Sequence, residues 1–218
     1  GTTPLYFAAQ YGHETCVKLL IEAGADKEAA DWVRWRFSGP LIRGTYALYL
    51  AVEYNNDACV KLLLDAGADA DKADDDGMTP LMAAVQNGND RIVKLLLEAG
   101  ADADKATCDI HTPIRCIPPR CGAALFDDGV TPLMVAAQNG NDACVKLLLE
   151  AGADANKAIN DGNTPLLIAA QNGRDACVKL LLDSGANKDK TNNDGTTPLY
   201  FAAQNGNETC VKLLIEAG

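Results

Sequence analysis

The chain has 218 residues, a formal net charge of -11 and a pI of about 4.5, with 22% charged and 6% aromatic residues. This length is sufficient for one large domain or two small ones with a buried core. The negative charge would repel a phosphate backbone, so nucleic acid is disfavoured as the main partner. There is no apolar run of about eighteen residues and no signal-peptide pattern, so no membrane association is expected.

Five Thr-Pro-Leu motifs mark the start of predicted helices, and where nothing intervenes they lie 33 residues apart: Thr3, Thr79, Thr131, Thr164 and Thr197. Thr is a good N-cap, and Pro suits the first helical position, where its missing N–H is not needed. A second apolar helix follows in each case and ends at a Gly such as Gly152, which can adopt the left-handed conformation. Neither helix can bury its apolar side alone, so the repeats must stack.

This pattern resembles the ankyrin-repeat family, whose unit of about 33 residues pairs two antiparallel helices with a β-hairpin finger. The resemblance implies an all-α repeat solenoid of six repeats, with first helices starting at Pro4, Ala47, Pro80, Pro132, Pro165 and Pro198. We treat residues 1–218 as a single ankyrin-repeat domain and expect it to be a segment of a longer array. Head-to-tail self-association through uncapped ends is a further expectation, which light scattering from a strict monomer would exclude.

The second repeat departs from the motif in two places. Tyr46-Ala47 stands where Thr-Pro is found elsewhere, which predicts a remodelled start of the first helix. We expect Asn56 to take the place of the helix-ending Gly, because Asn tolerates the left-handed conformation.

Two insertions break the spacing of the repeats. The distance from Thr3 to Tyr46 leaves 10 extra residues, and that from Thr79 to Thr131 leaves 19. Alignment of the flanking segments places the insertions at residues 32–41 and 107–125, each at the tip of a predicted finger. Such loops on a rigid scaffold are where binding groups concentrate.

The first insertion contains both Trp residues of the chain and two Arg residues. Trp and Arg are typical of the residues that dominate binding energy at interfaces. The predicted partner-binding residues here are Trp32, Arg34, Trp35, Arg36 and Phe37. The alternative is that these aromatics pack back onto the neighbouring helices as a small satellite core.

The second insertion contains Cys108, His111, Cys116 and Cys121, at a spacing that matches a zinc knuckle. Four such ligands can close a tetrahedral site around Zn²⁺. The order of residues departs from the knuckle, and its glycines are absent, so a disulfide between two of the three Cys, or free thiols, remain open alternatives. If zinc is bound, this loop would bind nucleic acid or protein in a metal-dependent way.

The same loop adds Arg115, Ile117 and Arg120 to the predicted partner-binding residues. The segment from Cys116 to Cys121 also has a short likeness to the Cys-bounded Pro-Pro loops of small plant serine-protease inhibitors. Those inhibitors place Lys or Arg before a Ser, whereas here Arg115 precedes Cys116. Inhibition of trypsin would support this reading, and simple cleavage after Arg115 or Arg120 would exclude it.

The remaining five Cys recur at one position of the second helix: Cys16, Cys59, Cys144, Cys177 and Cys210. Ile92 stands at the same position in the third repeat, which indicates a buried apolar site. Neighbouring helices lie roughly 8–10 Å apart, too far for a disulfide. A ladder of reduced core thiols favours the cytoplasm or the nucleus.

The resemblance implies a protein partner on the concave face formed by fingers and first helices. The corresponding residues are nearly uniform here: Asp75, Asp76, Met78, Gln86-Asn87, Gln138-Asn139 and Gln171-Asn172. We therefore assign recognition mainly to the insertions, which hold or flank five of the seven Arg and so suit a partner with an acidic surface. No phosphate loop, nucleophile elbow or carboxylate pair occurs, so we expect no enzyme and, zinc apart, no cofactor.

Overall fold

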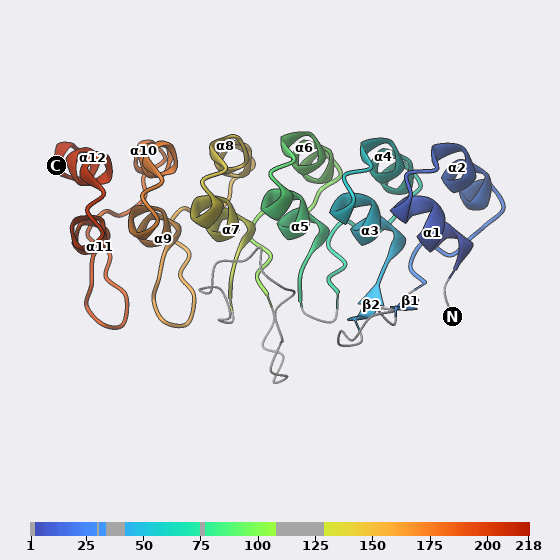
Figure 1. The fold of residues 1–218 in the computed structure, drawn as a ribbon, viewed down its shortest axis with the longest axis horizontal. Helices are drawn as coiled ribbons and strands as arrows, with labels where there is room; N and C mark the ends of the chain where they lie inside the picture. Colours follow the sequence, from blue (N-terminus) through green and yellow to red (C-terminus); the bar gives the residue numbers. More distant parts are fainter. Residues whose placement is uncertain (1–2, 30, 34–41, 75–76, 108–128) are drawn as a thin grey trace. The chain divides into compact units, whose positions relative to one another are not determined.

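The structure, a computed structural model, describes residues 3–29, 31–33, 42–74, 77–107 and 129–218. These residues form two compact units, one that ends at Asp102 and one that begins at Ala103. Each unit contains three repeats of paired helices (Figure 1). The predicted helical repeat fold is therefore confirmed.

The first helix of each repeat is short, with seven or eight residues: α1 (Pro4–Gln10), α3 (Ala47–Glu53), α5 (Pro80–Asn87), α7 (Pro132–Asn139), α9 (Pro165–Gln171) and α11 (Pro198–Gln204). Five of them start at the predicted Pro after a Thr N-cap. The Thr hydroxyl accepts the N–H of the third helical residue, as in Thr79 to Met82 at 3.2 Å. Tyr46 caps α3 without a side-chain hydrogen bond, as its departure from the motif predicts.

The second helix of each repeat has nine residues: α2 (Glu14–Glu22), α4 (Asp57–Asp65), α6 (Asp90–Glu98), α8 (Asp142–Glu150), α10 (Asp175–Asp183) and α12 (Glu208–Glu216). Within each unit first helices pack against first helices and second against second (Figure 1). The cores between them include the fully buried Leu63 and Leu96 in one unit and Leu148 and Leu181 in the other. Within the described residues no helix is long and apolar enough to cross a membrane.

The turn between α3 and α4 corrects one expectation. Asn55, with φ 58°, adopts the left-handed conformation that Gly provides in other repeats. Asn56 instead precedes α4 with φ -90°, and its side-chain amide donates to the carbonyls of Ala9 and Gln10 at 2.8 and 3.0 Å. The prediction for Asn56 was thus one residue out of register, because two adjacent Asn residues cannot be distinguished by residue type alone.

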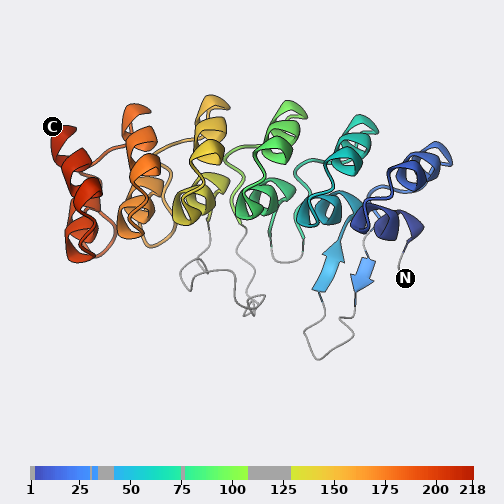
Figure 2. The same cartoon turned by 45° about the horizontal axis from the view of Figure 1, so that its top comes forward.

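A small antiparallel sheet stands at the first insertion. It consists of β1 (Asp31–Val33) and β2 (Ile42–Thr45), with Asp31 opposite Thr45 and Val33 opposite Ile42. Figure 2 shows both strands on the side of their unit where α1 and α3 lie. Two paired strands thus stand at the base of this finger, whereas the other fingers form turns without strands in the residues that the structure describes.

Candidate functional site

The bases of successive fingers are tied together by side chains, as the first unit shows. Glu28 accepts the N–H of Asp69 at 3.0 Å and forms an ion pair of 2.8 Å with the Lys72 ammonium. One repeat later, Asp71 accepts the N–H of Asp102 at 3.0 Å. Each acidic side chain therefore satisfies a backbone donor of the following repeat and fixes the spacing of the fingers.

The second unit has the same arrangement. Asp104 accepts the N–H of Asp154 at 3.1 Å, and Asn156 accepts that of Asn187 at 2.7 Å. The Lys157 ammonium reaches back to the carbonyl oxygen of Asp104 at 2.6 Å. In both units, therefore, the fingers extend from a base that is held by hydrogen bonds between repeats.

Each ordinary finger is closed by one backbone pair. The N–H of Asp74 donates to the carbonyl of Met78 at 3.0 Å, and the same bond joins Ile159 to Asn163 and Asn192 to Thr196. A Gly stands three residues after the start of the pair and donates back to it, as Gly77 does to Asp74. The pair and its Gly enclose just two residues at the tip.

Both insertions add residues at this tip, and the closing pair of each finger is retained. Asp31 pairs with Thr45 in the first finger. In the second, Thr107 donates to the carbonyl of Val130 at 3.0 Å and accepts the N–H of Gly129 at 3.3 Å. Thr107 is thus the ordinary closing residue and not part of the insertion at 107–125, so the added segment lies between Thr107 and Gly129.

The ends of the first helices carry a second set of contacts between repeats. In two repeats an Asn at the helix end reaches the preceding repeat: Asn87 donates to the carbonyl of Glu53 at 3.1 Å, and Asn205 to that of Gln171 at 2.8 Å. Asn172 differs, because its amide donates to Ile168 of its own helix at 2.8 Å. Asn87, Asn172 and Asn205 each follow a Gln at the same position of their repeats, but their side-chain hydrogen bonds differ.

Arg174 accounts for the exception. It stands where the other five repeats have Asn or His, and its Nε donates to the carbonyl of Gln138 at 3.0 Å. This is the carbonyl that Asn172 would reach by analogy with Asn205 and Gln171. In this repeat the guanidinium uses that acceptor, while Asn172 donates to its own helix.

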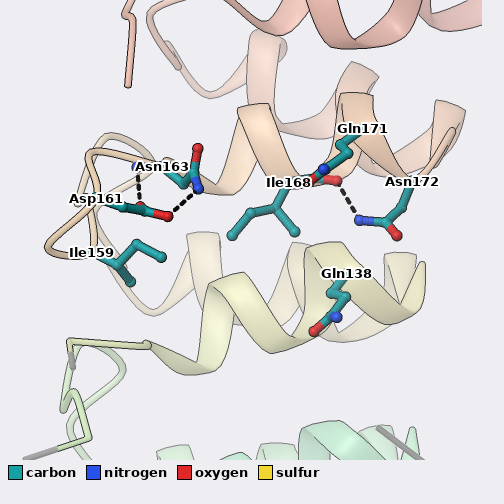
Figure 3. A pocket seen from close by; sticks show the side chains of 7 residues that line it. All are labelled: Gln138, Ile159, Asp161, Asn163, Ile168, Gln171 and Asn172. Atoms are coloured by element: carbon teal, nitrogen blue, oxygen red, sulfur yellow. Dashed lines mark hydrogen bonds between the residues drawn. The ribbon is translucent and has the colours of Figure 1, made fainter. Parts of the chain in front are cut away.

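A hollow of about 220 Å³ opens beside Asn172 in the second unit. Figure 3 shows the side chains that line it: Gln138, Ile159, Asp161, Asn163, Ile168, Gln171 and Asn172. They come from α7, from α9 and from the finger at residues 159–163. The finger lies at one end of the view, the carboxamides of the helix ends at the other, and Ile168 between them (Figure 3).

The hollow combines an apolar floor with polar ends. Ile159 and Ile168 are buried, at 5% and 6% exposure. Asp161 accepts two hydrogen bonds from Asn163, one from its N–H at 2.9 Å and one from its side-chain amide. The arrangement can hold a side chain that has an apolar stem and a polar or cationic end.

The finger beside the hollow is braced by the next finger. The N–H of Asn193 donates to the carbonyl of Asp161 at 2.9 Å, and its side-chain amide donates to Asn160 at 2.9 Å. Gly162, with φ +86°, lies so close that a Cβ there would stand 2.9 Å from the Cα of Asn192 and the N of Asn193. Asp161 is therefore presented by a fixed turn.

Comparisons with known proteins agree on the family. The family model for "Ankyrin repeats (3 copies)" matches residues 35–107, 115–192 and 133–218, and that for "Ankyrin repeat" matches residues 1–32. The chain belongs to the ankyrin-repeat family. A crystal structure of an ankyrin repeat domain from Acinetobacter baumannii AYE is 29% identical, with a TM-score of 0.80, and the match covers 99% of this chain and 97% of that one. No curated protein matches the chain.

Ankyrin repeats are generally protein–protein interaction modules and non-enzymatic binding scaffolds. In this ankyrin chain most of the predicted binding residues lie outside the described residues, as do all four predicted zinc ligands. Trp32 alone among them falls in β1. Within the described ranges, no group of three or more His, Cys, Asp or Glu side chains is arranged to hold a metal ion.

Two exposed tyrosines of the ankyrin first helices were missed in the sequence reading. Tyr11 and Tyr54 are 64% and 47% exposed and stand where later repeats have Asn. The Tyr11 ring stacks on Phe7 with centroids 6.3 Å apart, and the Tyr54 hydroxyl accepts a hydrogen bond from Gln10 at 3.1 Å. The signal was the replacement of Asn by Tyr at one register in two repeats.

The Cys ladder is buried as predicted, except at Cys16. Three of them interact with an acidic residue of the preceding repeat: Cys59 with Glu14, Cys177 with Asp142, and Cys210 with Asp175, whose carboxylate oxygen lies 2.9 Å from the Cys210 sulfur. Cys16 is in the first described repeat, where no earlier helix covers it. Burial raises the pKa of the Cys177 thiol to about 11, and burial together with Asp175 raises that of Cys210 to about 12.

Proposed function

We propose that this ankyrin-repeat chain is a scaffold that binds a protein partner through its two extended fingers together with its first-helix face. The observation that carries the proposal is the site of the insertions. Each replaces the two tip residues of a finger whose closing pair is kept. Such growth lengthens the loop without disturbing the base, which is how binding loops are carried on rigid scaffolds.

The residue types of the fingers support an interface. Trp32, Arg34, Trp35, Arg36 and Phe37 in the first, with Arg115, Ile117 and Arg120 in the second, combine large apolar area with charged donors. We propose a partner with an acidic surface opposite the fingers, because Arg is concentrated there on an otherwise acidic chain.

The test is to trim each finger back to ordinary length. Residues 32–43, or residues 108–128, are replaced by Asp-Asp, the sequence found at 75–76 between an intact closing pair and its Gly. The partner is isolated on the immobilised full chain, and its Kd is then measured for each variant. We expect at least one trimmed variant to bind about tenfold more weakly or worse, as the loss of an interface hot spot produces.

A matched control changes an exposed residue away from the fingers and the first helices. Lys61→Met, in α4, should leave the Kd unchanged. Wild-type affinity in both trimmed variants, with melting temperatures equal to that of the control, would refute the proposal.

A second mode is zinc-dependent binding of protein or nucleic acid by the second finger. It is supported by the hydrogen bonds at the base of that finger. The bonds between Thr107 and Val130 hold together the ends of the segment that contains Cys108, His111, Cys116 and Cys121. We propose to measure bound zinc in protein purified without a polyhistidine tag and to repeat the Kd measurement with a chelator. One equivalent of zinc and binding lost on chelation would support this mode, whereas absence of zinc would exclude it.

A further inference from the structure

We infer that the hollow of the second unit binds one Lys or Arg side chain from an extended segment of the partner. The inference rests on the proposed protein-binding function and gives the chemistry of one contact within it. It is independent of the two inserted fingers, because α7, α9 and the finger at residues 159–163 build the whole lining.

The size of the hollow fits a single side chain. Its volume of about 220 Å³ lies below the roughly 300–1,000 Å³ of pockets that hold drug-sized ligands. The apolar floor is buried: Ile159 lies at the finger end, and Ile168 lies between the polar ends. Lys and Arg can lay their methylene stems along such a floor while the charged head meets a polar group.

Asp161 supplies the complementary charge. A carboxylate has about four lone-pair positions, and Asn163 occupies two of them. The only charged side chain in the lining is therefore an anion with acceptor capacity left. The cations of the same repeats, Lys157 and Arg174, donate to the backbone carbonyls of Asp104 and Gln138, and Asp161 has no ion pair within the described residues.

The other end of the hollow suits a peptide backbone. Gln171 is exposed and makes no side-chain hydrogen bond to another described residue, and Asn172 uses only its amide, on Ile168. A carboxamide can both donate to and accept from a peptide group. A partner residue with its cationic head at Asp161 would place its main chain near these carboxamides (Figure 3).

Arg174 keeps the hollow open. By taking the Gln138 carbonyl, it leaves Asn172 folded onto its own helix. At the next junction Asn207 replaces the Arg, and both Asn205 and Asn207 donate to the preceding repeat, at 2.8 and 2.9 Å. An arginine on the scaffold thus shapes a site for a cation without entering the lining.

The binding test uses four blocked pentapeptides, Ala-Ala-X-Ala-Ala with X as Arg, Lys, Gln or Glu, titrated into the full chain and followed by ¹⁵N–¹H NMR. We expect saturable shifts of the amides of residues 159–163 and of the Gln171 carboxamide with Arg or Lys, and none with Glu or Gln. Asp161→Asn should weaken binding about fivefold, as loss of a partly exposed charge pair does.

The matched control is Asp194→Asn. Asp194 holds the same finger position one repeat later, 33 residues on, carries the same charge, and is not part of the lining of this hollow. Its removal should leave the affinity unchanged. Equal weakening by both variants, or equal shifts with the Glu peptide, would overturn the inference in favour of diffuse attraction to an acidic surface.

Arg174→Asn separates the two explanations further. The change makes the chain more acidic, so diffuse attraction of a cationic peptide would strengthen. A built site would instead close as Asn172 moves to the Gln138 carbonyl, and binding should weaken at least about threefold. Tighter binding by this variant would contradict the inference. Partner capture that depends on the fingers but not on Asp161 would refute this site alone and leave the proposed function intact.

Discussion

Lys72 and Glu28 form an ion pair of 2.8 Å across two successive repeats, and the same ammonium donates to the Glu28 carbonyl at 3.2 Å. It also lies 4.0 Å from the centre of the Tyr46 ring. Burial by itself lowers the pKa of Lys72, but the hydrogen bond and the charge of Glu28 outweigh it and raise the pKa above its usual value. One side chain therefore ties the first finger base to the second repeat.

We expect Lys72→Met to lower the free energy of unfolding by about 1 kcal/mol, since the ion pair is partly exposed and the ring contact adds to it. A raised folded-state pKa stabilises the protein below the unfolded pKa of about 10.4, and this contribution is lost as the pH rises through the folded value. Urea unfolding at pH 7 and pH 11 should show the difference shrinking at the higher pH. The exposed Lys61, changed to Met, is the control; an equal loss there would show that Lys72 has no special role.

Gly162→Ala should destabilise the chain more than Gly195→Ala does. Both glycines have positive φ, +86° and +74°, so both changes incur about 1–2 kcal/mol of left-handed strain. Only at Gly162 would the new Cβ meet backbone atoms, 2.9 Å away, and overpacking adds about 1 kcal/mol or more. Urea unfolding of the two variants measures this difference in the free energy of unfolding. Equal losses would mean that neighbouring fingers move apart without cost and so relieve the close contact.

The repeat itself could be predicted from sequence because its signals are local. A Thr hydroxyl and a Pro ring start a helix through contacts within four residues, and a Gly ends it through its own φ. The count of extra residues rests on equally local signals: closing pairs such as Asp74 and Met78 recur at fixed spacing, and Asp31 with Thr45 preserves that spacing apart from the inserted length.

The hollow could not be predicted, because contacts between repeats create it. Asn172 and Asn205 have the same neighbours in sequence, but Arg174 binds the Gln138 carbonyl 36 residues earlier, and Asn207 stands in its place in the next repeat. The boundary predicted for the second insertion, at residue 107, differs from the structure for a similar reason. Thr107 replaces the Asp of other fingers, and only its pairing with Val130 shows that it still closes the turn.

Thiol reactivity should separate Cys16 from the buried cysteines. The thiolate is the reactive form, and a pKa of about 11 at Cys177 and about 12 at Cys210 leaves very little of it near neutral pH. With iodoacetamide at pH 8, peptide mapping should show Cys16 labelled at least about a hundredfold faster than these two. In urea the rates should converge; native labelling of Cys177 at the rate of Cys16 would show that the ladder opens.

Thr107 provides a test of the base of the second finger, which Thr107 and Val130 close. Its hydroxyl accepts the N–H of the buried Val130 at 3.1 Å, and an unpaired buried donor costs about 1–3 kcal/mol. We expect Thr107→Val to speed hydrogen exchange at the Val130 amide about tenfold, measured by NMR, while Thr107→Ser keeps the acceptor and the protection. If the pairing of Thr107 with Val130 also orders the recognition residues of the second insertion, Thr107→Val should weaken partner binding. The affinity of the Arg pentapeptide for the hollow should not change. Unchanged exchange at Val130 in Thr107→Val would show that the backbone pair alone holds the loop closed.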